Sequence, residues 1–312
     1  NRNRIINGNF DIWQRGTSFA SQTAEAYFAD RWKVKPATGC TMTVSRQAFT
    51  VGQTDVPYEP TYFLRADITT AGSANAEIMQ KIEDVRTFAG QTIAVSFWAK
   101  STAGTQTLTC RTIQEFGSGG SANVVSSGTT AVLTSSWQKV TFSVAIASIS
   151  GKTIGSGSAF SFNFYWPNSS TSNDVDLAQV QVEAGSTYTP FEYKSFGQEL
   201  AACERYYSKS YNTDVAPATS GAVGACSSLA IYSSGSQSLG ARWVTSMRKV
   251  PTVVIYPTGS TNTGYVTQTS NNAEVAATAG DIGMGGFQYL SGSLPTSNAN
   301  GVRFHWSADA EL

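Results

Sequence analysis

Apolar and polar residues alternate along most of the first 190 residues, which is the pattern of strands buried on one face. The clearest runs cover residues 62–68, 76–82, 92–99, 107–113, 137–146, 160–166 and 175–183. In the last run the alternation shifts by one position near Ala178, which predicts a β-bulge. Segments rich in Gly and Ser separate the runs, and we expect residues 116–136 to be a surface loop. About ten short strands without a long helical period predict an antiparallel β-sandwich.

The period changes after residue 194. Phe196, Leu200, Cys203 and Tyr207 recur at helical spacing, and Ser195 with Gln198 fits a capping box. We therefore expect a short connecting helix within residues 195–210.

Strand patterns resume in residues 211–312, at 229–232, 240–244, 252–256, 287–290 and 302–306. This part has few aliphatic residues for its length, so it buries little apolar area by itself. We expect neighbouring subunits to stabilise it, most simply in a homotrimer. The fold class is therefore all-β, with a β-sandwich in residues 1–194 and a smaller β-rich C-terminal domain.

Charge and cysteine content exclude several classes of protein. The 21 basic and 21 acidic residues give a formal net charge of zero, which argues against nucleic-acid binding. No apolar run is long enough to span a membrane, so we expect no membrane insertion. The four cysteines are far apart with no CxxC spacing, and we expect buried free thiols.

No catalytic motif stands out in the sequence. Its one histidine, His305, lies in a predicted strand, with no nucleophile or acid that the sequence places beside it. P-loop, GxSxG and post-strand GxGxxG patterns are missing. Two carboxylates could still meet in space to hydrolyse sugars, although no spacing favours a pair; the candidates are Asp30, Asp67, Glu77, Glu83 and Asp84. We expect a protein that is not an enzyme.

Three acidic residues could hold a hard cation. Asp11 follows an Asn-Gly-Asn turn near the start, and Asp174 and Asp176 open the last strand of the sandwich. If the first and last strands are neighbours, their carboxylates could surround a structural Ca²⁺, which prefers oxygen ligands. The alternative is that these acids only cap turns.

Aromatic side chains are the other chemical signal. With 7 tryptophans and 13 tyrosines in a weakly charged chain, rings could stack on sugars while Asn, Gln, Ser and Thr supply hydrogen bonds. Core packing is the alternative for each of them. The carbohydrate-binding candidates are Trp98, Trp137, Tyr165, Trp166, Tyr289 and Trp306.

Several stretches resemble the tail-fibre and receptor-binding proteins of bacteriophages and prophages. They are Asn3-Arg-Ile-Ile-Asn-Gly-Asn-Phe-Asp-Ile-Trp-Gln-Arg-Gly-Thr-Ser18, Ala29-Asp-Arg-Trp32, Gln179-Val-Gln-Val-Glu-Ala-Gly185, Thr189-Pro-Phe-Glu192 and Cys203-Glu-Arg-Tyr-Tyr207. Asn7-Gly-Asn-Phe-Asp11 and Asn173-Asp-Val-Asp-Leu177 are also similar to carbohydrate-binding modules of the jelly-roll type. That resemblance implies a jelly roll with a structural calcium at Asp11 and Asp174, although Asp11 stands where the module pattern usually has glutamate.

These observations lead to one expected function and two rivals. We expect a virion adhesin, in a phage tail fibre or spike made in the bacterial cytoplasm, that binds a bacterial surface polysaccharide or lipopolysaccharide without catalysis. Its other partners would be virion proteins, and its cofactor at most Ca²⁺. A structural connector or head decoration protein of the virion is the first rival, and a polysaccharide depolymerase is the second.

Overall fold

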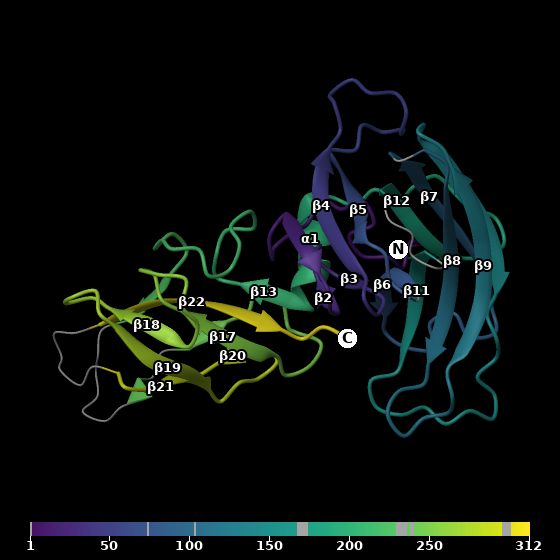
Figure 1. Cartoon of the computed structure of the whole chain (residues 1–312). Coiled ribbons are helices and arrows are strands. Elements are labelled where there is room, and N and C mark those ends of the chain that lie inside the picture. The colour runs from purple at the N-terminus through teal and green to yellow at the C-terminus, as the bar shows by residue number, and fades with distance from the viewer. Residues whose placement is uncertain are drawn as a thin grey trace. The chain divides into compact units, whose positions relative to one another are not determined.

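The computed structural model describes residues 2–73, 75–102, 104–166, 174–228, 236–237, 240–294 and 301–312. The chain forms two compact units (Figure 1). The sandwich unit contains Asn1–Asp11, Thr17–Phe196 and Leu312, and the C-terminal unit contains Ile12–Gly16 and Gly197–Glu311. No helix among the described residues is long and apolar enough to cross a membrane.

The sandwich unit is a jelly roll of two antiparallel six-stranded sheets. Sheet A contains, in spatial order, β1 (Ser18–Gln22), β4 (Thr41–Ala48), β5 (Tyr62–Thr70), β12 (Val175–Ala184), β7 (Thr92–Ser101) and β10 (Gln138–Ala145). Sheet B contains β2 (Ala26–Tyr27), β3 (Trp32–Lys35), β6 (Ala76–Ile82), β11 (Ala159–Trp166), β8 (Gln106–Glu115) and β9 (Val124–Leu133). The chain crosses repeatedly between the sheets, so residues far apart in sequence meet on each face.

Strand alternation builds the core between the two sheets. Phe97 of β7 and Phe164 of β11 are both fully buried, and their ring centroids lie 4.9 Å apart in an edge-to-face arrangement. Because successive side chains of a strand point to opposite faces, the neighbours of Phe97 in β7 and of Phe164 in β11 point to the outer faces of the two sheets. Apolar burial holds the two sheets together.

Strand β12 contains the bulge that the sequence predicts. Its register with β7 shifts between Ala178 and Gln181, and Gln179 has a positive φ of 50°. After the bulge, the N-terminal segment replaces β5 as the neighbour of β12: the Val180 N–H donates to the Gly8 carbonyl at 2.8 Å, and the Arg4 N–H donates to the Val182 carbonyl at 2.9 Å. The first and last segments of the sandwich are therefore adjacent.

The C-terminal unit is built around its last strand, β22 (Val302–Asp309), which pairs with β13 (Tyr207–Lys209), β14 (Cys226–Ser228), β17 (Thr252–Tyr256) and β18 (Tyr265–Gln268). The sheet continues through β19 (Glu274–Gly280) and β21 (Tyr289–Gly292) to β15 (Ser236–Gln237). Strands β16 (Ala241–Arg242) and β20 (Gly286–Phe287) form a separate pair. Its core includes Trp243 and Trp306, with ring centroids 4.6 Å apart.

A segment from the other end of the chain, Ile12–Gly16, completes the C-terminal unit. We call it the strap. Gln14 Nε2 donates to the Tyr207 carbonyl at 2.9 Å, and the guanidinium of Arg15 lies 3.7 Å from the Tyr207 ring centroid. Arg15 also forms ion pairs with Asp309 at 3.1 Å and Glu311 at 3.4 Å. The last strand of the unit is thus tied to residues near the start of the chain.

The structure confirms the all-β fold, and every strand expected in the sandwich after residue 60 is present. The expected loop at 116–136 is wrong, because residues 124–133 form β9 at the edge of sheet B. The helix is shorter than expected: α1 covers Phe196–Glu204, and Tyr207 instead pairs in β13. The strand expected at 229–232 lies outside the described residues. The predicted domain boundaries themselves stay predictions.

Candidate functional site

Aromatic and cationic side chains lie next to one another on the outer face of sheet A. Alternation in β7 places Ser96 and Trp98 on this face, on either side of the core residue Phe97. Lys139 of β10 lies directly opposite Trp98 in the antiparallel pairing. The sequence pattern of these two strands is therefore sufficient to bring an indole and an ammonium group together.

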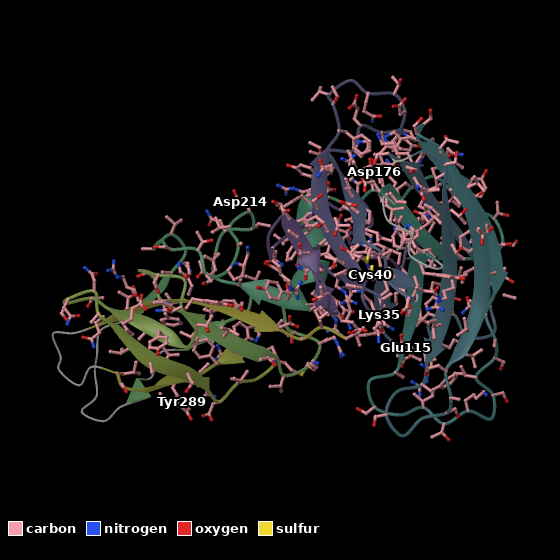
Figure 2. All side chains as sticks on the ribbon, viewed as in Figure 1. Lys35, Cys40, Glu115, Asp176, Asp214 and Tyr289 are labelled. Atoms are coloured by element: carbon pink, nitrogen blue, oxygen red, sulfur yellow. The ribbon has the colours of Figure 1, made fainter. Side chains whose placement is uncertain are left out.

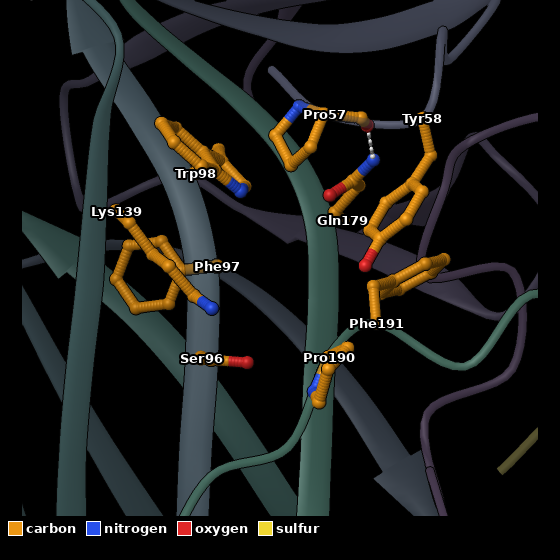
Figure 3. A pocket seen from close by; sticks show the side chains of 9 residues that line it. All are labelled: Pro57, Tyr58, Ser96, Phe97, Trp98, Lys139, Gln179, Pro190 and Phe191. Atoms are coloured by element: carbon orange, nitrogen blue, oxygen red, sulfur yellow. Dashed lines mark hydrogen bonds between the residues drawn. The ribbon is translucent and has the colours of Figure 1, made fainter.

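A pocket of about 130 Å³, partly open to solvent, lies on this face. Figure 3 shows its labelled side chains: the Trp98 indole forms one wall, and the rings of Tyr58 and Phe191 form the opposite wall. Polar groups from Ser96, Gln179 and Lys139 point between these walls. The remaining lining residues are Pro57, Phe97 and Pro190.

Gln179 is aimed at the pocket by the bulge in β12. Its Nε2 donates to the Pro57 carbonyl at 2.7 Å and to the Tyr193 hydroxyl at 2.8 Å, so it ties two loops to the strand. The Tyr193 ring packs on Tyr58 at 5.7 Å and on Phe191 at 5.0 Å between centroids. Burial raises the pKa of Tyr193 to about 12, so its hydroxyl stays protonated at neutral pH. The pocket wall is therefore preorganised by internal contacts.

A second group of aromatic rings lies on the neighbouring strands. Phe49, Phe63 and Trp137 pack with centroid distances between 4.8 and 5.3 Å. The ammonium of Lys100, two residues after Trp98, lies 5.2 Å from the Trp137 ring centroid. Two of the six aromatic candidates from the sequence, Trp98 and Trp137, thus belong to this one face.

The three predicted calcium ligands are not brought together as a site. Asp176 is fully buried and forms two hydrogen bonds with Arg65, of 2.7 and 2.9 Å, while Lys100 lies 3.7 Å away. Asp11 instead accepts a hydrogen bond from Asn9 at 2.9 Å. No group of three or more His, Cys, Asp or Glu side chains among the described residues could hold a metal ion. Calcium stays a prediction that these contacts do not support.

Asp174 has a different carboxylate partner, Asp67. Burial and the hydrogen bond that protonated Asp67 donates to Asp174 raise the pKa of Asp67 to about 6, because two adjacent carboxylates are most stable when they share a proton. Thr102 Oγ1 also donates to Asp174 at 3.0 Å. Sugar-hydrolysing pairs stand about 5–10 Å apart, so a directly hydrogen-bonded pair does not match that geometry.

The outer face of sheet B carries a charged groove of about 220 Å³. Its cations are matched by carboxylates: Lys33–Glu25 at 2.5 Å, Lys81–Glu115 at 2.5 Å, Arg111–Glu77 at 2.8 Å, and Lys35 at 3.9 Å from both Glu25 and Glu77. Figure 2 labels Lys35 and Glu115 in this region. The groove is already neutralised from within.

The other aromatic candidates lie elsewhere. Trp166 and Trp306 are only 1% and 5% exposed, so the sequence-based choice of these two is corrected: each continues a buried alternation, after Phe164 and Phe304 respectively. Tyr165 lies on the outer face of sheet B, with Arg111 at 4.7 Å from its ring centroid. Tyr289 packs over Gly280 in the C-terminal unit, where an added Cβ would lie 2.2 Å from its ring (Figure 2).

His305 has a hydroxyl neighbour that the sequence could not place. Its Nδ1 lies 2.9 Å from Ser210 Oγ, and its Nε2 lies 3.2 Å from the Gly221 carbonyl. Ser210 Oγ also accepts a hydrogen bond from the Trp306 N–H, so it donates to Nδ1 while Nε2–H donates to Gly221. Burial lowers the pKa of His305. The imidazole is neutral and links two loops to β22.

Comparisons with solved structures give distant similarity in fold. The tailspike protein 4 enzymatically active domain of bacteriophage CBA120 is 13% identical, with a TM-score of 0.34, over 59% of this chain and 22% of that chain. A family 11 carbohydrate-binding module from Clostridium thermocellum is 11% identical, with a TM-score of 0.35, over 56% and 99% of the two chains. A Stig cyclase from Fischerella is 10% identical, with a TM-score of 0.40, over 60% and 98%.

These values carry no argument about function. The chain spans about a fifth of the tailspike domain's length, since 22% of that domain is covered. No protein-family profile and no curated protein matches the sequence. Function must therefore be argued from the residues of the chain itself.

Proposed function

We propose that the sandwich unit binds a glycan without catalysis, in the pocket between Trp98 and the Tyr58–Phe191 wall. One observation carries the proposal: two aromatic walls face each other across a cavity, with polar groups between them (Figure 3). Aromatic faces pack against the apolar faces of sugar rings, and the carboxamide of Gln179 and the hydroxyl of Ser96 can bond to sugar hydroxyls. Apolar walls with a few polar groups between them are typical of small-ligand sites.

The biological role that fits this chemistry is host adhesion. We infer a phage tail fibre or spike in the virion that recognises a polysaccharide or lipopolysaccharide of a bacterial surface. A single pocket of this size gives weak binding, and several copies in one particle would give firm attachment. The resemblance of Asn3–Ser18 and Cys203–Tyr207 to tail-fibre proteins supports this role.

A homotrimer is the assembly we propose. Phe196 of α1 is 56% exposed, and Val223, Val244 and Val250 of the C-terminal unit are exposed as well. Burying these side chains between subunits would supply apolar area. Analytical ultracentrifugation of the purified chain should give three times the monomer mass of 33.2 kDa; a monomer at micromolar concentration would contradict this assembly.

The test of glycan binding is an array of bacterial surface polysaccharides together with binding to whole cells. Wild-type protein should bind a subset of glycans, and Trp98→Ala should reduce that binding by at least about tenfold, since stacking contributes on the order of 1–2 kcal/mol. Tyr165→Ala is the matched control, because it removes an aromatic ring from the outer face of sheet B. Loss of binding in the Tyr165 variant but not in the Trp98 variant would move the site to sheet B.

The non-catalytic part of the proposal has its own measurement. Incubation of the bound polysaccharide with the protein should release no reducing ends over many hours. Release that is abolished by substituting a carboxylate would make the protein a depolymerase.

A structural connector is the second candidate, favoured by the same exposed side chains of the C-terminal unit. It predicts no affinity for any glycan and burial of Val223, Val244 or Val250 against another virion protein. Wild-type protein that binds neither the array nor host cells would favour it.

A further inference from the structure

Lys139 is the one cationic side chain that points into the pocket, and its charge is not neutralised there. Among the residues that the structure describes, it forms no ion pair; its recorded contact is with the ring of Tyr188, whose centroid lies 4.6 Å from Nζ. The ammonium lies beside Trp98 and above Ser96, directed toward the cavity (Figure 3). The other side chains that line the pocket are uncharged.

The neighbouring cations of the same face differ from Lys139. Arg65 and Lys100 both contact the buried carboxylate of Asp176, at 2.7 and 3.7 Å. In the groove of sheet B, each cation likewise has a carboxylate within ion-pair distance, as at Lys33 and Arg111. Of these cations, Lys139 alone has no carboxylate within ion-pair distance among the described residues, and it lies where a ligand would sit.

We propose that the pocket selects a sugar residue that carries an anionic group, a carboxylate such as that of a hexuronic acid, and that Lys139 Nζ is the partner of this group. The inference rests on the proposed glycan binding and adds its charge specificity. The walls formed by Trp98 and Tyr58 would hold the ring, while the carboxylate completes the ion pair that the protein lacks. Because Lys139 is exposed to solvent, the gain is modest and falls as salt is added.

The experiment compares matched sugar probes on the full chain. Titration calorimetry or saturation-transfer NMR would use methyl β-D-glucuronide against methyl β-D-glucoside, and methyl α-D-galacturonide against methyl α-D-galactoside. Glucose 6-phosphate and glucose 6-sulfate serve as additional arms that separate a carboxylate from other anions. We expect the uronides to bind roughly fivefold tighter than the neutral partners, with the preference reduced in 0.5 M salt, as for an exposed ion pair.

Two variants assign the effect to the ammonium group. Lys139→Gln should abolish the preference for the uronides, and Lys139→Arg should retain it. Lys33→Gln, in the charged groove of sheet B, should leave the preference unchanged. Circular dichroism melting confirms that each variant is folded.

The possible outcomes separate the two claims. Equal binding of uronide and neutral sugar, or a preference that survives Lys139→Gln, overturns the charge specificity and leaves glycan binding intact. A stronger preference for phosphate or sulfate than for carboxylate overturns the assignment of the anion. Wild-type protein that binds none of these sugars and no polysaccharide on the array overturns the proposed function as well.

Discussion

Gln179 donates a hydrogen bond of 2.7 Å to the carbonyl of Pro57, and this bond joins the bulge of β12 to the loop that carries the Tyr58 wall of the pocket. A second bond from the same Nε2, to the Tyr193 hydroxyl at 2.8 Å, reaches the loop that carries Phe191. One carboxamide therefore positions the whole wall opposite Trp98. Both loops would lose that anchor if the carboxamide were removed.

We predict that Gln179→Met reduces glycan binding by at least about tenfold, because losing two hydrogen bonds of about 1 kcal/mol each frees both loops. The variant should remain folded, with a free energy of unfolding lower by about 1–3 kcal/mol. Glycan-array binding and chemical denaturation measure the two effects. Gln47→Met, on β4 and two strands from β12, is the control. Unchanged binding by the Gln179 variant would show that the wall does not depend on this anchor.

The shared proton of Asp67 and Asp174 predicts a pH dependence of stability. The folded protein raises the pKa of Asp67 from 3.8 to about 6, so it binds this proton more tightly than the unfolded chain does. The resulting stabilisation is complete below pH 3.8 and is lost as the pH rises through about 6. Asp67→Asn keeps a hydrogen-bond donor and removes the charge repulsion at neutral pH.

Asp67→Asn should therefore raise Tm at pH 7.5, by no more than about 4 °C because the pair is largely exposed and screened. At pH 4 the variant and wild type should melt within about 1 °C of each other. Differential scanning calorimetry at both pH values tests this, with the exposed Asp55→Asn as control. A lower Tm at pH 7.5 would contradict the shared proton.

The ion pair between the buried Asp176 and the partly exposed Arg65 predicts a loss of stability when it is broken. Asp176→Asn leaves Arg65 without its carboxylate partner, and the free energy of unfolding should fall by about 1–3 kcal/mol, because Arg65 can still be solvated. Urea denaturation measures this loss.

The contacts of Asp176 also predict that the protein does not depend on calcium. Because Arg65 already occupies the Asp176 carboxylate, adding 1 mM EDTA or 5 mM CaCl₂ to wild type should leave Tm unchanged. A rise in Tm of several degrees with calcium would instead support the predicted metal site.

A close backbone approach makes Gly8 irreplaceable. A Cβ at this position would lie 2.2 Å from the Val180 carbonyl oxygen, so Gly8→Ala must push the N-terminal segment away from β12. We expect a loss of about 1–3 kcal/mol in unfolding free energy, as for other overpacked sites. Gly52→Ala is a useful comparison, because its added Cβ meets no atom within 4 Å and only its positive φ of 82° opposes the change. A Gly8→Ala variant as stable as the wild type would show that the N-terminal segment moves away from β12 at no cost.

The alternation of apolar and polar residues predicts most strands of the sandwich. It also separates the aromatic residues of the core from those of the outer faces. Phe160, Phe162, Phe164 and Trp166 occupy one face of β11, so Trp166 belongs to the core by the same rule that places Trp98 outside. Trp306 follows Val302 and Phe304 in the same way on β22. The position of each tryptophan within its strand therefore indicates that Trp166 and Trp306 are core residues.

Strand β9 and the pocket wall depend on tertiary contacts, which the alternation of apolar and polar residues does not predict. Strand β9 was missed because it is an edge strand rich in Ser and Thr, whose valines Val125 and Val132 are largely exposed. The pocket wall combines Tyr58, Gln179 and Phe191 from two loops and a bulge, where the direction of a side chain is set by tertiary hydrogen bonds. The sequence identifies Trp98 as a candidate, but neither the neighbouring Lys139 nor the residues of the opposite wall.

The strap has a consequence for how this chain can be divided or recombined. Gln14 and Arg15 supply hydrogen bonds and ion pairs to Tyr207, Asp309 and Glu311, so the C-terminal unit is not encoded by one continuous stretch. A fragment starting at Gly197 would lack these groups. A C-terminal unit exchanged at α1 would likewise need the segment Ile12–Gly16, about 190 residues upstream of Tyr207, to be exchanged with it.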